Sequence, residues 1–112
     1  MKRDIGLFIQ DILDSIKDIK SFSKGLTKEK FKSDKLKQNA IIRSLEVIGE
    51  AAKNIPGFFR EKYPNIPWRE IAGFRDVLSH AYFGVSVDRA WNIIEKDLPK
   101  LKEDLSKIEK EI

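Results

Sequence analysis

The sequence predicts an all-α protein, an antiparallel bundle of four to five helices. Two observations lead to this prediction. Apolar residues recur every three or four positions through long segments, as they do along one face of a helix. No segment sustains the alternating pattern that a half-buried strand requires. With 112 residues, 41% of them hydrophobic, the chain is long enough to bury a core, and we expect a single domain over residues 1–112.

The first two predicted helices cover about residues 3–22 and 34–54. Apolar side chains of the first share helical spacing: Ile5, Phe8, Ile9, Ile12, Ile16 and Ile19. Those of the second do as well: Ile41, Leu45, Ile48, Ala52 and Ile55. Gly25 is placed to end the first helix, and Thr27 or Ser33 to cap the next one. The Pro56-Gly57 pair stops the second helix.

Two further helices complete the predicted bundle. After a short helical turn at "FFREKYP", a third helix opens near Pro67 and runs through His80, and Gly84 ends that region. A fourth begins behind a Ser86 cap, with a kink at Pro99 because proline lacks the backbone N–H of the helix ladder. Its apolar face extends well beyond the proline, while the neighbouring helices are shorter. Such an overhanging face tends to bury against a second copy, so we expect a two-fold homodimer.

Composition excludes several classes of function. The chain has no cysteine, which removes disulfides, cysteine-ligated zinc, iron–sulfur clusters and thiol nucleophiles. No apolar run is long enough to span a membrane, and Asp11 and Asp14 interrupt the apolar start that a secretory signal would need. We therefore expect a cytoplasmic protein.

The net charge of +4 is concentrated in one segment. Residues 24–37 hold six lysines against one glutamate and one aspartate, so this segment nets +4 and the rest of the chain sums to zero. Such a basic segment can attract phosphate chains. The alternative, which charge patterning favours, is a solvated lysine-rich loop and helix start.

The stretch "FRDVLSHAYFG", residues 74–84, holds the only histidine of the chain. Arg75 lies five residues before His80, and Tyr82 lies two after it. Histidine titrates near neutral pH and suits proton transfer, and arginine forks onto phosphate oxygens, so the pair suits chemistry on a phosphodiester. A metal site is a poor interpretation of one histidine without cysteines or a flanking carboxylate pair, and no cofactor is expected. The alternative is a core histidine, with Arg75 paired to Asp76 or to a carboxylate of the second helix.

Helix geometry limits how this pair can act. On an ideal helix, residues five apart point about 140° away from each other, so Arg75 and His80 do not share a face, whereas Arg75 and Tyr82 do. For the pair to meet at one phosphate, the helix must loosen near Ser79, or the site must form between two chains. Cleavage of RNA through its 2′-hydroxyl also needs one base and one acid. A two-fold dimer supplies two histidines, so the catalytic and dimer predictions support each other.

A polar stripe on the second predicted helix offers supporting residues. Spacings of four, three and four place four side chains on one face: Asn39, Arg43, Glu46 and Glu50. In one interpretation they form internal ion pairs, each worth roughly a few tenths of a kcal/mol. In the other, Glu50 or Arg43 reaches the cleft and orients Arg75 or His80. The sequence leaves both interpretations open.

The chain resembles the HepT family of HEPN domains over nearly its whole length. "RDVLSHAY" matches the R-x-x-x-x-H-x-Y motif of HEPN domains. "RDIGLFIQDILDSIKDI" resembles the first helix of the family, "IIRSLEVIGEAAKNI" the second and "WNIIEKDLPKL" the closing helix. HepT proteins are the toxins of HEPN/minimal-nucleotidyltransferase toxin–antitoxin pairs. The resemblance implies a single HEPN domain that dimerises with the motif in a cleft at the seam, and a metal-independent ribonuclease.

The resemblance also implies a role for each motif residue. Arg75 would hold the scissile phosphate, and His80 would act as general base or acid. Asp76 stands where family members often carry asparagine, and it places a negative charge beside the phosphate site. Tyr82 resembles the tyrosine that the partner nucleotidyltransferase, the antitoxin, modifies with AMP to silence the toxin. The other function class is a non-catalytic HEPN module that binds a nucleotidyltransferase partner or its nucleotide, and RNA turnover dependent on His80 separates the two.

Overall fold

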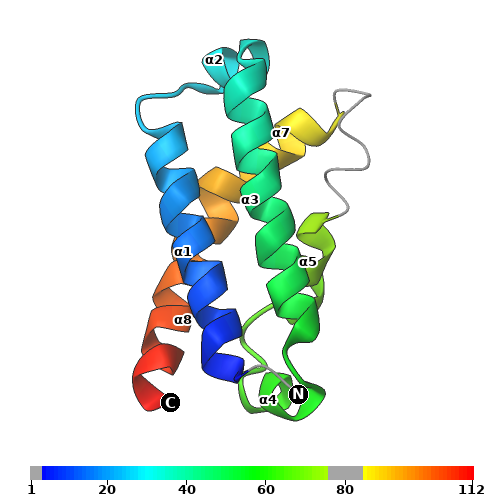
Figure 1. Cartoon of the computed structure of the whole chain (residues 1–112). Helices are drawn as coiled ribbons and strands as arrows, with labels where there is room; N and C mark the ends of the chain where they lie inside the picture. The colour runs from blue at the N-terminus through cyan, green and yellow to red at the C-terminus, as the bar shows by residue number, and fades with distance from the viewer. Residues whose placement is uncertain (1–3, 76–84) are drawn as a thin grey trace.

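The computed structural model of the chain describes residues 4–75 and 85–112, and the regular structure in these ranges is entirely helical (Figure 1). The elements follow in this order: α1 (Ile5–Ser23), α2 (Lys28–Ser33), α3 (Lys35–Asn54), α4 (Gly57–Lys62), α5 (Trp68–Ala72), the 3-10 turn η1 (Gly73–Arg75), α7 (Val85–Asn92), the π-helical turn η3 (Ile93–Asp97) and α8 (Leu98–Glu111). The predicted all-α fold class is confirmed.

The long helices α1 and α3 form the centre of the bundle and run antiparallel (Figure 1). Their apolar stripes face each other and form most of a single core, with these side chains almost fully buried: Ile9, Ile12, Ile19, Ile41, Leu45 and Ile48. The helical spacing read from the sequence therefore gave the buried face of both helices correctly. Burial of these branched side chains supplies the main free energy of folding.

Helix ends follow local capping chemistry. Asp4 caps α1 by accepting a hydrogen bond from the Gly6 backbone N–H at 2.9 Å. Gly25 follows the end of α1 with a φ of 76°, a left-handed conformation that glycine adopts without steric cost, as predicted for a helix stop. The end of α3 is completed by the Arg60 guanidinium, which donates to the carbonyls of Ile55 and Ala52 at 2.9 and 2.8 Å.

The junction between α2 and α3 differs from the prediction. Thr27 caps the short helix α2 by accepting from the Lys30 N–H at 3.2 Å. Asp34, and not Ser33, caps α3 by accepting from the Lys37 N–H at 3.0 Å. The Ser33 hydroxyl instead donates to the Lys30 carbonyl at 3.1 Å, because Ser33 lies in the last turn of α2. The prediction missed this extra short helix.

A π-helical turn lies just before Pro99, where the sequence predicts a kink. The π-helical turn η3 comes directly before α8, and the Leu98 N–H donates to the Ile93 carbonyl, five residues back. Pro99 is the second residue of α8, where its missing N–H interrupts the regular ladder. Further upstream, α7 already includes Val85, so Ser86 lies inside this helix rather than capping it. Up to residue 75, the predicted third helix is α-helical only from Trp68 to Ala72, and a 3-10 turn follows from Gly73 to Arg75. Its predicted course from residue 76 through His80, and its end at Gly84, fall outside the described residues.

The expectation of an overhanging apolar C-terminal helix is wrong. Leu101, Leu105 and Ile108 are only 4%, 0% and 5% exposed within one chain. They are covered because α8 packs antiparallel against α1 (Figure 1). The large apolar side chains that are exposed in the described ranges lie elsewhere: Leu7, Leu36, Phe58 and Ile112. The C-terminal helix therefore gives no support to a dimer.

None of the described helices combines the length and the apolar character that crossing a membrane would require.

Candidate functional site

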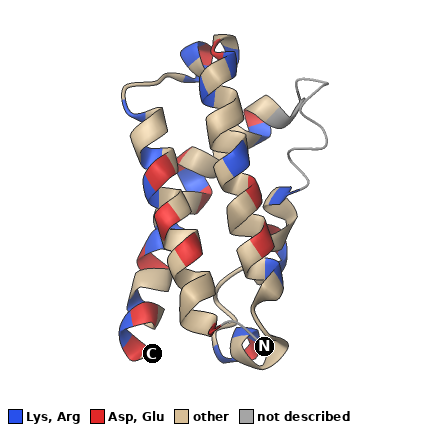
Figure 2. Cartoon of the chain, viewed as in Figure 1, with Lys and Arg blue, Asp and Glu red and all other residues tan. Residues whose placement is uncertain are grey.

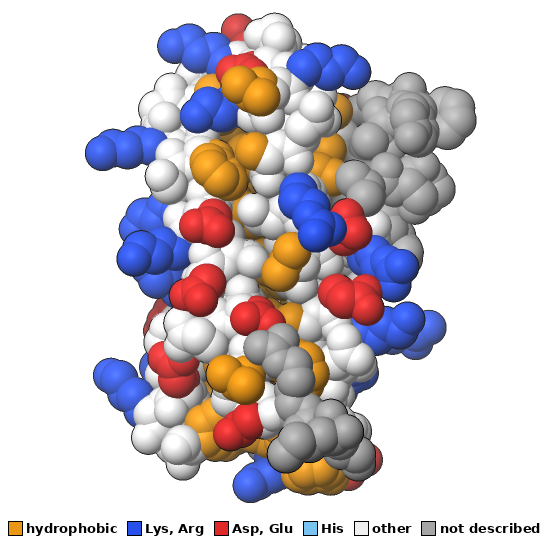
Figure 3. All heavy atoms as spheres, in the orientation of Figure 1, with side chains coloured by type: hydrophobic (Ala, Val, Ile, Leu, Met, Phe, Trp, Pro, Cys, Tyr) orange, Lys and Arg blue, Asp and Glu red, His pale blue; other side chains and the backbone are white. Residues whose placement is uncertain are grey.

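A groove of about 340 Å³ lies on the face formed by α1, α3 and η1. It is lined by Phe8, Asp11, Arg43, Glu46, Val47, Glu50, Ala51, Asn54 and Arg75. Figure 3 shows this face of the molecule, where acidic and basic side chains lie side by side with apolar side chains between them. The groove thus combines cations and carboxylates with an apolar floor, and it contains three of the predicted site residues.

Arg75 and Glu50 form an ion pair at the edge of this groove. The Arg75 Nη1 donates to Glu50 Oε2 at 2.9 Å, and both side chains are 51% exposed. An ion pair this exposed contributes only about 0–1 kcal/mol to stability. Its structural effect is orientation, because the carboxylate holds the guanidinium at the groove while leaving other N–H donors for a ligand. For Glu50, this contact agrees with the second of the two interpretations left open by the sequence, in which a residue of the second predicted helix reaches Arg75.

Gly49 explains how η1 comes so close to α3. A Cβ atom at this position would lie 2.9 Å from the Arg75 backbone nitrogen and 3.1 Å from the Ala72 carbonyl oxygen. Glycine costs about 1 kcal/mol relative to alanine inside a helix, but only glycine leaves room for this backbone contact. The next residue, Glu50, is thereby brought within reach of Arg75. The sequence interpretation missed this role, although a lone glycine inside the helical pattern "EVIGEA" was a signal for it.

Arg43 makes a different contact from Arg75. Its Nη1 lies 3.1 Å from Glu46 Oε1, one turn further along α3, and its side chain is 69% exposed. The polar stripe of α3 therefore contains both arrangements that the sequence allowed. Arg43 pairs within its own helix, and Glu50 reaches across to Arg75.

The positions of the remaining predicted site residues are outside the described ranges: Asp76, His80 and Tyr82. The described residues on either side are firmly packed. Phe74, just before them, is 3% exposed, and Val87 and Trp91 in α7 are 9% and 8% exposed. Trp91 packs on Phe31 of α2 with ring centroids 5.4 Å apart. Residues 76–84 are therefore flanked by buried anchors at both ends.

The described part of the groove can bind an anion through arginine, which forms two parallel hydrogen bonds to phosphate or carboxylate oxygens. Within residues 4–75 and 85–112, no three carboxylate or histidine side chains come close enough together to hold a metal ion. The chemistry that these residues themselves offer is charge pairing with a phosphate, oriented by a neighbouring carboxylate.

The chain is a helical bundle that holds an arginine in a groove, five residues before its single histidine, an arrangement suited to chemistry on a phosphodiester. A family model described as "Ribonuclease HepT-like" matches residues 12–108, and the chain belongs to this family of ribonucleases. The predicted family is confirmed. No solved structure matches the chain significantly.

Relatives of known sequence cover the chain from end to end. The "Probable ribonuclease HepT" of Thermococcus cleftensis is 46% identical over 110 residues, which is 98% of this chain and 100% of that protein. A Methanocaldococcus jannaschii protein named "Gamma-glutamylcyclotransferase and putative RNase" is 46% identical over 112 residues, which is all of this chain. The chain spans only 50% of that second relative, which is about twice as long.

Proposed function

We propose that this ribonuclease cleaves single-stranded RNA without a metal ion, using Arg75 and His80. The observation that carries this proposal is the position of Arg75, which lies at a groove and is oriented by Glu50 at 2.9 Å, five residues before the only histidine. Family membership supports ribonuclease chemistry, and the names of the relatives support the same substrate class. Arg43 and Glu50 support the site from α3, and Asp76 adds a negative charge next to Arg75.

The proposed reaction is an internal displacement at phosphorus. The 2′-oxygen of one ribose attacks the adjacent phosphate, and the bond from phosphorus to the 5′-oxygen of the next nucleotide breaks. His80 accepts the proton of the 2′-hydroxyl as general base, and an acid returns a proton to the leaving 5′-oxygen. Arg75 binds the non-bridging phosphate oxygens and stabilises the negative charge that builds on them. The products are a 2′,3′-cyclic phosphate and a 5′-hydroxyl end.

We propose that the acid is the His80 of a second chain in a two-fold homodimer. The reaction needs one base and one acid, and each chain has one histidine. A dimer that joins the two motif segments would supply both groups, together with two arginines. The need for one acid and one base is what supports the dimer. The apolar face of α8 does not support it, because α1 already covers that face within one chain.

The metal-independent mechanism predicts that purified protein cleaves single-stranded RNA in excess EDTA as fast as in magnesium. All of the charge stabilisation in the proposed reaction comes from arginine, so chelation removes nothing that it uses. Denaturing gel electrophoresis of an end-labelled oligonucleotide measures the rate. Cleavage that stops in EDTA and returns with a divalent cation would contradict the proposal, and the absence of any RNA cleavage would favour a non-catalytic binding module.

We further propose that the protein is a toxin whose partner nucleotidyltransferase, the antitoxin, transfers AMP to Tyr82. The phenol oxygen of Tyr82 attacks the α-phosphate of ATP, and pyrophosphate leaves. The new phosphodiester brings a negative charge and an adenine ring to the motif, where the phosphate can occupy the arginine fork and the ring can fill the RNA-binding groove. The position of Tyr82, two residues after His80 in the R-x-x-x-x-H-x-Y motif, supports this proposal.

Co-expression with such a nucleotidyltransferase should add one or more AMP units at Tyr82 and abolish RNA cleavage. Peptide mass spectrometry locates the modification, and the oligonucleotide assay measures the loss. Tyr82→Phe should remain active after the same co-expression, because it lacks the accepting oxygen. If Tyr82→Phe is inhibited as strongly as the unaltered protein, the partner acts by occlusion and the modification proposal is wrong.

A further inference from the structure

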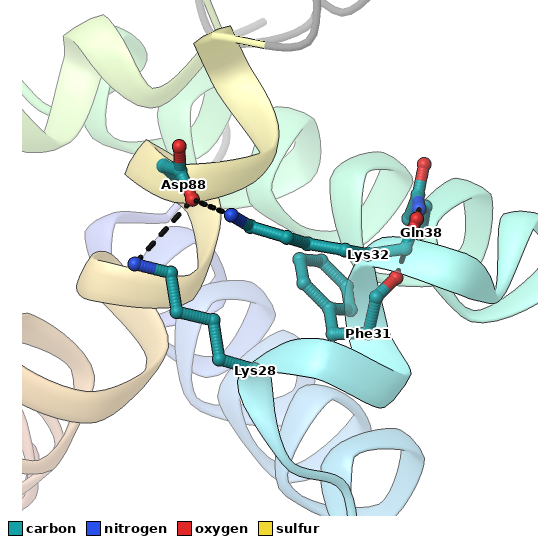
Figure 4. A network of polar contacts seen from close by, with 5 residues as sticks. All are labelled: Lys28, Phe31, Lys32, Gln38 and Asp88. Atoms are coloured by element: carbon teal, nitrogen blue, oxygen red, sulfur yellow. Dashed lines mark hydrogen bonds and ion pairs between the residues drawn. The ribbon is translucent and has the colours of Figure 1, made fainter.

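Two lysines of the basic segment share one carboxylate at the contact between α2 and α7 (Figure 4). Lys28 Nζ lies 3.4 Å and Lys32 Nζ lies 3.0 Å from the same oxygen, Oδ1 of Asp88. The three side chains are 52%, 51% and 53% exposed, so both ammonium groups remain accessible from solvent. An exposed arrangement of this kind contributes little to stability, so stability alone does not account for it.

The helix that carries these lysines is firmly held. Phe31, between them in sequence, is fully buried and packs on Trp91 of α7. The buried Gln38 side chain of α3 donates from Nε2 to the carbonyls of Phe31 and Lys32 at 2.8 and 2.9 Å (Figure 4). A solvated lysine-rich loop would need neither contact. Charge patterning favoured a solvated lysine-rich loop and helix start, and the lysines of α2 are indeed exposed. The structure adds that α2 has a fixed position on α3 and α7.

Charge at this contact favours an anion. Two lysines face one aspartate, so the cluster retains a net positive charge. Hydrogen bonding from Lys32 is the largest cause that lowers the pKa of Asp88, so the carboxylate stays ionised at neutral pH. Each ammonium has three N–H donors, and one bond to Asp88 leaves donors for a second acceptor. Figure 2 shows further cationic residues at this end of the bundle, where residues 24–37 carry the net charge of +4.

Asp88, the acidic partner of the lysine pair, lies close in the chain to the motif. Asp88 is in the first turn of α7, which begins directly after residues 76–84. Arg75 precedes the same residues, and Figure 1 shows α5 and α7 on the same side of α3. A nucleic acid strand that runs from Arg75 along this side of the bundle to α7 can therefore meet two cationic groups in turn, Arg75 and the lysine pair held on Asp88. Proteins that bind single strands commonly follow the backbone with such a series of cations.

We propose that Lys28 and Lys32, at the contact between α2 and α7, form a subsite for the phosphate backbone of single-stranded RNA. This proposal rests on the proposed ribonuclease function, and it adds a second position at which the RNA strand is bound. Asp88 Oδ1 holds the two ammonium groups against α7, at 3.4 and 3.0 Å. When RNA binds, a phosphate oxygen takes the donors that Asp88 does not use. The competing explanation is an ion pair that only fastens α2 to α7.

Binding of a 2′-O-methyl RNA oligonucleotide tests the subsite without cleavage, because the attacking hydroxyl is blocked. The double variant Lys28→Gln/Lys32→Gln should raise the Kd. It should also reduce the slope of log K against log salt by about 1.4, since each phosphate contact to a single strand contributes about 0.7. Asp88→Asn should bind RNA at least as tightly as the unaltered protein, because it removes a competing carboxylate and keeps both lysines.

Lys107→Gln/Lys110→Gln is the matched control, with the same loss of charge on the exposed side of α8. Equal weakening by the control and by the α2 double variant would overturn the subsite, since net charge alone would then explain it. So would an unchanged Kd and salt slope in the α2 variant, as expected if the lysines bind an acidic protein instead. If Asp88→Asn weakens RNA binding as much as the lysine changes do, the ion pairs only hold α2 on α7, and the subsite is wrong. These outcomes concern binding alone, whereas failure of the proposed function would show as uncleaved natural RNA with binding intact.

Discussion

His80→Ala is expected to lower the rate of RNA cleavage by roughly 10²–10⁴-fold, because it removes the only imidazole that can transfer protons near neutral pH. The measurement is the single-turnover rate on an end-labelled oligonucleotide with protein in excess. Binding of the same oligonucleotide should change little, since proton transfer contributes to the transition state and not to the bound substrate.

The unaltered protein and His80→Ala should have the same helical circular dichroism and the same sedimentation mass. We expect that mass to be about twice the 13.0 kDa of one chain, because the proposed acid and base come from two chains. A variant that unfolds would identify His80 as a core residue instead. A monomer of full activity would leave the two-histidine mechanism without its second histidine.

Arg75→Ala is expected to lower cleavage by about 10²–10³-fold, the loss that follows removal of one donor to a developing oxyanion. Stability should change by no more than about 1 kcal/mol, since the side chain is 51% exposed and its ion pair with Glu50 is exposed too. Arg75→Lys should recover only part of the activity, because lysine keeps the charge and loses the two-pronged geometry. Cleavage rates and thermal unfolding measure the two effects separately.

Arg43→Ala is the control for charge in the same groove. Arg43 is 69% exposed and pairs within α3 to Glu46, so we assign it a supporting role. Its removal should lower cleavage much less than the removal of Arg75. Equal losses would place the scissile phosphate over α3, and an unaffected rate in Arg75→Ala would remove Arg75 from the catalytic site.

The long helices could be predicted because their apolar periodicity is strong and local. Ile12 and Leu45 lie on the buried faces that this periodicity indicates. The short helix α2 could not be predicted in the same way, because "KEKFKS" contains one apolar residue and no period. Its position depends on the burial of Phe31 against Trp91, a contact between residues that lie 60 apart in the sequence. The packing of α1 on α8 could not be predicted from periodicity either. Periodicity shows which face of a helix is apolar, but it does not show which element covers that face.

The candidate site divides in the same manner. The chemistry of residue types and the family motif indicated Arg75, and the spacing along the second predicted helix indicated Arg43 and Glu50. Spacing within one helix could not decide which carboxylate reaches Arg75, because that contact joins α3 to η1. The role of Gly49 depends on the same tertiary approach, in which the Arg75 backbone nitrogen lies only 2.9 Å from the place that a Cβ atom would take.

The chemical nature of the ends produced from RNA in excess EDTA tests the proposed catalysis by Arg75 and His80 most directly. Attack by the 2′-hydroxyl predicts a 2′,3′-cyclic phosphate, or a 3′-phosphate after its hydrolysis, with a 5′-hydroxyl on the other fragment. Mass spectrometry of the fragments identifies both ends, and neither product should form with His80→Ala. Fragments with 3′-hydroxyl and 5′-phosphate ends would show that water attacks the phosphate, and would contradict this mechanism.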